Sequence, residues 1–142
     1  MGCDIHLHIE IKLDNKWEHY STPKIDRNYA LFEKMAGVRS SGSISPICNP
    51  KGLPKDATLL TLLDYSTFRG YGHSASWLDE NEIMILEDYI KDVLGKDLEH
   101  NILNIYFFGN SFTSKFRFPE ETYYKDIMDR ISSVRFVFWF DN

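Results

Sequence analysis

The chain has 142 residues, of which 43% are hydrophobic and 15% aromatic, so it can bury the core of a single domain over residues 1–142. Its 21 acidic and 16 basic residues give a net charge of -5. That balance argues against a polymeric nucleic-acid partner, because binding to a DNA or RNA backbone needs a cationic surface. No run of about 20 apolar residues occurs and no signal peptide fits, so we expect no membrane partner and a cytoplasmic location.

The first expected element is a β-strand that runs to about Leu13, because polar and apolar residues alternate along it. One face of this strand is apolar. The other face carries four consecutive titratable side chains, Asp4, His6, His8 and Glu10. We interpret this face as the floor of a polar site, because the polar face of a half-buried strand usually carries Thr, Ser, Lys or Gln. The alternative is an exposed face rich in charge.

The next stretch indicates a hairpin and then a helix. Residues 14–16 form a turn, and residues 17–20 can return antiparallel, with His19 in solvent. Asp26 can cap a helix over 28–36, which Gly37 ends. Residues 38–56 contain many Ser, Pro and Gly residues, and an irregular stretch this long is usually a functional loop.

The middle of the chain is harder to assign. Residues 58–63 are a short apolar segment, helix or strand. Gly70 and Gly72 shape a second long loop that presents His73, Ser74, Ser76 and Trp77. Asp79 and Glu82 make a capping box that opens a helix to about Leu94.

The last third predicts three further elements. Residues 102–108 read as a strand, residues 119–131 as a helix, and residues 134–142 as a strand. The last strand is apolar on both faces, which is typical of a central position. The pattern predicts an α+β fold: one domain with a mixed, mostly antiparallel sheet, about three helices and long functional loops.

Four stretches together resemble a family of small, uncharacterised proteins of tailed phages and prophages. They are the opening Met-Gly-Cys-Asp-Ile-His, residues 27–32 with 36–39, residues 73–78, and residues 135–142. The resemblance spans the whole chain in order. It implies a protein that acts in the cytoplasm of an infected bacterial host, and it implies no established activity, cofactor or fold.

Two kinds of catalysis can use these residues. Asp4, His6 and His8 share one strand face, where they can chelate a divalent metal that activates water, with His73 as a further ligand. Without a metal, His6 and His73 can act as an acid–base pair, while Arg27 or Arg69 neutralises a phosphoryl oxygen. No cofactor is required in that case.

The third mechanism is binding without turnover. Aromatic rings can hold a planar ligand, guanidinium groups can bind phosphate, and amides, hydroxyls and imidazoles can donate hydrogen bonds. The candidate ligand-binding residues are Asp4, His6, His8, Arg27, Asn28, Tyr29, Arg69, Tyr71, His73, Ser74, Ser76 and Trp77. The acidic surface suits a closed pocket for one small ligand better than a groove for a polymer.

We therefore expect a phage-type protein that binds a small nucleotide-derived ligand. In a viral setting, a cyclic nucleotide or an ADP-ribose-type immune signal is the natural candidate, and the protein would be an anti-defence sponge. A phosphodiesterase that uses His6 and His73, with or without metal, is the first alternative. A structural or host-protein-binding module is the second. The sequence is also compatible with a homo-oligomer in which two subunits share a pocket.

Overall fold

The computed structural model of the chain describes residues 2–94 and 129–142. Four strands, β1 (Asp4–Leu13), β2 (Lys16–Ser21), β3 (Gly72–Leu78) and β4 (Ile131–Asp141), form one antiparallel sheet in the order β2-β1-β4-β3. Three α-helices are described, α1 (Tyr29–Ala36), α2 (Leu59–Ser66) and α3 (Glu80–Tyr89), and a π-helical turn, Ile90–Leu94, extends α3. This confirms an α+β fold with about three helices.

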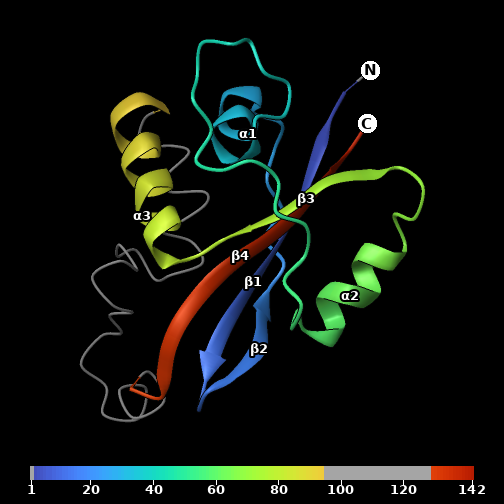
Figure 1. Cartoon of the computed structure of the whole chain (residues 1–142), viewed down its shortest axis with the longest axis vertical. Helices are drawn as coiled ribbons and strands as arrows, with labels where there is room; N and C mark the ends of the chain where they lie inside the picture. The colour runs from blue at the N-terminus through green and yellow to red at the C-terminus, as the bar shows by residue number, and fades with distance from the viewer. Residues whose placement is uncertain (1, 95–128) are drawn as a thin grey trace.

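The sheet has one apolar and one polar face. Pairing between β1 and β4 sets Ile5 beside Phe140 and Leu7 beside Phe138, and these residues join the core beneath α1 and α3. The same register sets His6 beside Trp139 and Glu10 beside Arg135 on the opposite face. Helices α1 and α3 lie on one side of the sheet and α2 on the other (Figure 1).

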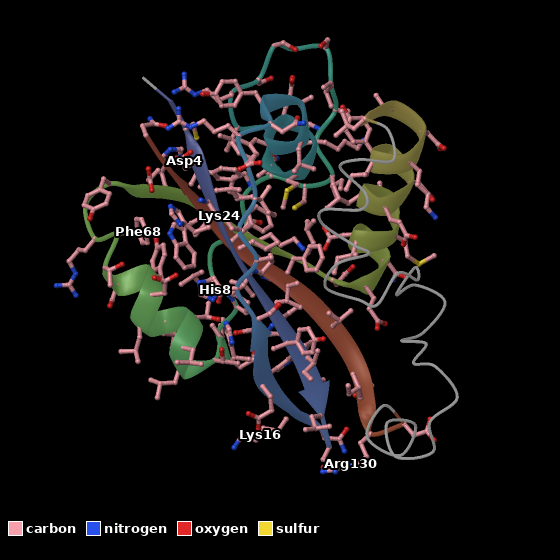
Figure 2. All side chains as sticks on the ribbon, turned by 180° about the vertical axis from the view of Figure 1, so that it is seen from behind. Asp4, His8, Lys16, Lys24, Phe68 and Arg130 are labelled. Carbon is pink, nitrogen blue, oxygen red and sulfur yellow. The ribbon has the colours of Figure 1, made fainter. Side chains whose placement is uncertain are left out.

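The two ends of the sheet differ in character. At one end, the β1–β2 turn meets the start of β4, where Arg130 pairs with Asp14 and lies near Lys16 (Figure 2). At the other end, the start of β1 lies beside the end of β4 and the start of β3, because Asp4 and Gly72 both pair with Asp141. This second end holds most of the predicted site residues.

Local chemistry explains the helix ends. The side chain of Asn28 accepts a hydrogen bond from the backbone N–H of Leu31, so Asn28 caps α1, and the predicted cap Asp26 is wrong. Gly37 ends α1 with a φ of 71°, as expected. The capping box of Asp79 and Glu82 is confirmed at the start of α3.

The middle of the chain contains one helix and one strand that the sequence left unassigned or assigned to a loop. The short segment at residues 58–63 belongs to the helix α2. The predicted loop that carries His73 is instead the strand β3, so that prediction is wrong. β3 is irregular, since its register with β4 shifts between His73 and Ser76, and Ser74 has a φ of 55°. A bulge of this kind hides the period-two pattern.

The end of the chain is partly as predicted. The final strand is central, between β1 and β3, as its two apolar faces indicated. It begins at Ile131, so the expected end of a helix at this residue is wrong. The predicted strand over 102–108 and the rest of the predicted helix over 119–131 lie outside the described residues, apart from the short stretch at 129–131.

Candidate functional site

His6 stands at the accessible end of the polar face. Its Nε2 donates to Asp141 Oδ2 at 2.6 Å, and its ring packs on Phe68 and Trp139 at centroid distances of 4.1 and 5.9 Å. The side chain is 28% exposed. In a neutral imidazole, this bond to a carboxylate places the ring proton on Nε2 and leaves the lone pair on Nδ1. His6 is thus oriented as a general base would be.

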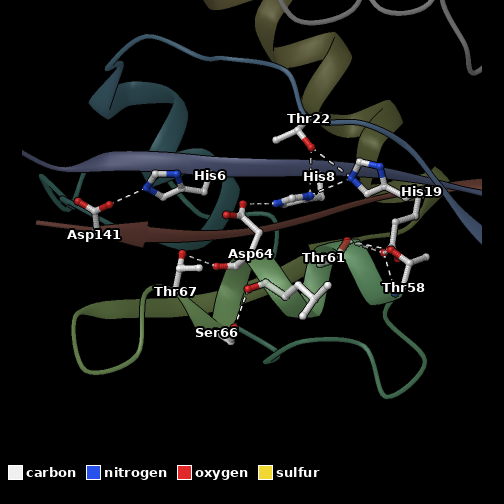
Figure 3. Close-up of polar contacts among 12 residues, drawn as sticks. His6, His8, His19, Thr22, Thr58, Thr61, Asp64, Ser66, Thr67 and Asp141 are labelled. Carbon is white, nitrogen blue, oxygen red and sulfur yellow. Dashed lines mark hydrogen bonds and ion pairs between the residues drawn. The ribbon is translucent and has the colours of Figure 1, made fainter.

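His8 is a buried residue at the centre of a chain of polar side chains. Its Nε2 bonds Asp64 Oδ2 at 2.7 Å, and its Nδ1 lies 2.9 Å from His19 Nε2 (Figure 3). The hydroxyl of Thr22 is 3.2 Å from both of these imidazole nitrogens. Burial, together with the nearby His8, lowers the pKa of His19. The expectation that His19 is a solvated residue is therefore wrong.

Glu10 is fully buried and tied to α2 and β4. Its carboxylate accepts hydrogen bonds from the backbone and hydroxyl of Thr58, from Thr61 and from Arg135. Burial by itself would raise the pKa of Glu10, but these hydrogen bonds outweigh it and lower the pKa. Since His8 and Glu10 are both occupied beneath α2, the accessible part of the polar face is its Asp4–His6 end.

Asp4 forms a two-point ion pair with Arg27. The distances are 2.6 Å from Nε to Oδ1 and 3.0 Å from Nη2 to Oδ2, and the hydrogen bonds from Arg27 lower the pKa of Asp4. The guanidinium lies directly over Gly2, because a Cβ there would be 1.9 Å from Arg27 Nη1. The hydroxyl of Tyr29 accepts from the backbone N–H of Cys3 at 3.2 Å. Arg27 and Tyr29 therefore border the ends of the strands, while Asn28 serves as a helix cap.

The opposite face carries a cleft of about 590 Å³ at the same end of the sheet. His73 lies on the ring of Phe140, and its nitrogens bond Asn142 Oδ1 at 3.2 Å and Ser74 Oγ at 3.0 Å. The guanidinium of Arg39 lies 5.4 Å from the centre of the Tyr29 ring. The lining residues are Ala36, Gly37, Val38, Arg39, Asn49, Pro50, His73, Ser74 and Asn142.

The predicted catalytic pair of His6 and His73 does not share one pocket. His73 pairs with Phe140 and His6 pairs with Trp139, and adjacent residues of a strand point to opposite faces. The two imidazoles contact consecutive residues, Asp141 and Asn142, from opposite sides of the sheet. The sequence brings both histidines to one end of the sheet, but the prediction of a common cavity is wrong.

Four other predicted ligand-binding residues do not line the cleft. Arg69 is exposed beyond α2, and Tyr71 is exposed with its hydroxyl bonded to Thr67 O. Ser76 is buried and accepts from the backbone N–H of Lys51. The ammonium group of Lys51 lies 4.0 Å from the centre of the Trp77 ring. Ser76 and Trp77 thus anchor the segment that carries Lys51.

The predicted metal ligands Asp4, His6 and His8 each bond a different partner. Within residues 2–94 and 129–142, no three His, Cys, Asp or Glu side chains converge in a way that could hold a metal ion. In the same ranges, no helix has the length and hydrophobicity needed to cross a bilayer.

Sequence reasoning missed several functional candidates. Asp141 ends the apolar strand β4 and Asn142 follows it, and in the sequence both belong only to the closing motif at residues 135–142. Asn49 lies in a segment without periodicity, and Arg39 lies at the start of the irregular stretch that follows α1. The one local signal at Arg39 is its place directly after the end of α1, where it has a φ of 57°. A comparison with known proteins adds nothing to these assignments, because the chain matches no protein-family model, no curated protein and no solved structure.

Proposed function

We propose that this protein captures a small, anionic, nucleotide-derived molecule in the cleft beside His73. The observation that supports the proposal is the cleft itself, whose volume of about 590 Å³ is in the usual range for small-molecule sites. It combines a guanidinium, an imidazole, a hydroxyl and two amides with a few apolar side chains. Convergent polar groups on a partly apolar wall are typical of such sites.

The lining suits a phosphorylated ligand. Arg39 supplies a planar guanidinium, the cation best matched to phosphate oxygens. Asn49 and Asn142 supply amides that can both donate and accept, as recognition of a base or a ribose requires. Pro50 and Val38 offer apolar contact to a planar ring.

The setting of the proposal comes from the resemblance to phage proteins. A phage protein that holds a nucleotide-derived molecule without consuming it can act as a sponge for an immune signal of the infected cell. Cyclic nucleotides and ADP-ribose-type molecules are the two chemical classes to test, since both combine phosphate, ribose and a planar base.

The experiment is incubation of the purified protein with a panel of cyclic nucleotides and NAD-derived molecules. The protein is separated from free ligand and heat-denatured, and the supernatant is chromatographed. We expect intact ligand in stoichiometric amounts from the wild type. Asn49→Asp should lose it, because a carboxylate in the cleft repels an anion. Asn15→Asp, the same change in the β1–β2 turn, should retain it.

Two results would contradict this function. One is that the wild type retains no member of the panel. The other is that Asn49→Asp retains ligand as well as Asn15→Asp does, because binding would then lie elsewhere on the protein.

A hydrolase that cleaves the same class of molecule is the second candidate. The observation that favours it is the orientation of His6 by Asp141, with Nδ1 given no hydrogen-bond partner among residues 2–94 and 129–142. A general base needs this arrangement to accept a proton from water or from a ligand hydroxyl. Asp141 is then a positioning residue, and the His6–His73 pair gives way to a His6–Asp141 pair.

The two candidates are separated by the fate of the ligand. A hydrolase would convert excess ligand to a new product when the protein is present in substoichiometric amounts. His6→Gln would abolish formation of that product. His73→Gln distinguishes the two faces of the sheet, because it alters an imidazole that lines the cleft on the face opposite His6. Product formation at His6 should survive this change, whereas retention of ligand in the cleft should weaken. Asp141→Asn would shift the pH profile of the reaction. Quantitative recovery of intact ligand after long incubation would rule the hydrolase out.

A further inference from the structure

Helix α2 has its polar and apolar sides reversed relative to an ordinary surface helix. Its buried side chain is Thr61, which bonds Glu10, while Asp64 reaches His8. Four leucines face outward: Leu59 is 70% exposed, Leu60 57%, Leu62 43% and Leu63 54%. Amphipathic helices normally bury their apolar face, so an outward row of leucines indicates a surface that a partner covers.

The positions of these leucines define one continuous surface. At about 100° of rotation per residue, the four leucines span an arc of roughly 160° that lies opposite Thr61. No charged residue interrupts the arc, since it runs Leu-Leu-Thr-Leu-Leu with the threonine pointing inward. We call these four side chains, Leu59, Leu60, Leu62 and Leu63, the leucine face.

We propose that the leucine face is the interface of a homodimer, in which α2 packs antiparallel against α2 of a second copy. The sequence of the face reads the same in both directions about Thr61. A two-fold axis at Thr61 therefore sets Leu59 against the partner subunit's Leu63 and Leu60 against the partner subunit's Leu62. In a two-fold interface, when residue i contacts residue j of the partner, residue j also contacts residue i, and both of these leucine pairings meet that condition.

Charge at the two ends of α2 favours the same antiparallel arrangement with a second copy. The exposed Lys55 precedes the helix. Antiparallel docking brings Lys55 toward the C-terminal end of the partner subunit's α2, which is the negative end of that helix dipole, and it also opposes the two helix dipoles. A parallel arrangement would place like charges together.

The size of the face predicts how tight the dimer is. A helix of eight residues is about 12 Å long, so the two copies bury less than a standard stable interface does. We therefore expect a reversible dimer of micromolar or weaker affinity. This inference does not depend on the function proposed for the cleft.

The first test is sedimentation equilibrium of the full chain over a wide concentration range. We expect a monomer–dimer equilibrium that the double variant Leu60→Asp, Leu63→Asp shifts to monomer. Ile85→Asp is the matched control, because it places the same charge on an exposed apolar residue of α3 and should leave the dimer intact. Circular dichroism confirms that each variant is folded. A wild-type monomer at every concentration would overturn the proposal, as would a dimer that survives the double variant.

The second test is the register of the helices. A mixture of Leu59→Cys and Leu63→Cys proteins should form a disulfide-linked heterodimer under mild oxidation, several-fold faster than either variant alone. Equal rates in the mixture and in the separate variants would contradict the antiparallel two-fold arrangement. The native Cys3 is buried, and the wild type run alongside reports any cross-link through Cys48.

Discussion

The buried ion pair of Glu10 and Arg135 offers the sharpest stability prediction. Both side chains are almost fully buried, with Arg135 Nε 2.8 Å from Glu10 Oε1, and the pair joins β1 to β4. The substitution Glu10→Gln keeps the shape of the side chain and removes its charge. It leaves Arg135 with Asp56 as its remaining carboxylate and turns an amide toward Thr58 and Thr61.

Breaking a buried ion pair from one side costs about 3–5 kcal/mol, because the remaining charge stays out of water without its buried partner. Arg135 keeps only Asp56, whose side chain is 66% exposed. That loss is a large fraction of the roughly 5–15 kcal/mol that holds a domain of this kind together. In a chain of this length it corresponds to a fall in Tm of about 6–20 °C.

The assay is urea unfolding followed by circular dichroism, with Asp14→Asn as the control. Asp14 also pairs with an arginine, Arg130, but at the exposed end of the hairpin, so its loss should leave the unfolding midpoint within error. A Glu10→Gln protein that loses less than about 1 kcal/mol would refute the reasoning, because the pair would then be no stronger than a surface one.

The same carboxylate predicts a pH dependence. The pKa of Glu10 is lowered in the folded protein from its usual value of 4.5. Its contribution to stability is thus fully present above pH 4.5 and is lost as the pH falls through the lowered folded value. Glu10→Gln should therefore flatten the acid limb of the stability curve, and an unchanged acid limb would contradict this assignment.

Three further predictions test other parts of the structure. The pKa of His19 is lowered from 6.5 in the folded protein, so as the pH falls the unfolded chain takes up a proton at this histidine before the folded chain does. The free energy of unfolding should therefore decrease as the pH drops below 6.5, and His19→Gln should reduce this decrease in urea titrations. Gly37→Ala should cost about 1–2 kcal/mol from backbone strain, because Gly37 has a φ of 71°, whereas the added Cβ would make only ordinary contact with Pro46 at 3.7 Å. Asn28→Ala should cost about 1 kcal/mol by removing the α1 cap, whereas Asp26→Ala should be neutral in the same melting experiment.

Several elements follow from local chemistry and are visible in the sequence. Alternation over the first strand fixes which side chains of β1 share a face, because the pleat has a period of two residues. Gly37 ends α1 and the Asp79–Glu82 box starts α3, because each depends on groups within one turn of the helix. The apolar residues on both faces of β4 indicate a central strand for the same kind of local reason.

The site depends on contacts between residues that are distant in the sequence. His8 meets His19 and Asp64 only because the β1–β2 register and the docking of α2 bring them together. The cleft joins the end of α1, the segment at Asn49, the start of β3 and the end of the chain. No local pattern specifies such a meeting, since each segment has ordinary chemistry by itself.

The sequence by itself determined the strand that carries Asp4 and His6, the end of α1, the start of α3 and the α+β class, because spacing and capping act over a few residues. The tertiary structure decided that His73 lies on the face opposite His6, because the register of β3 against β4, with its bulge at Ser74, sets that orientation. The tertiary structure also decided that the leucines of α2 are exposed to solvent. That choice arises because buried Glu10 and His8 need the polar side of the helix as their hydrogen-bond partner.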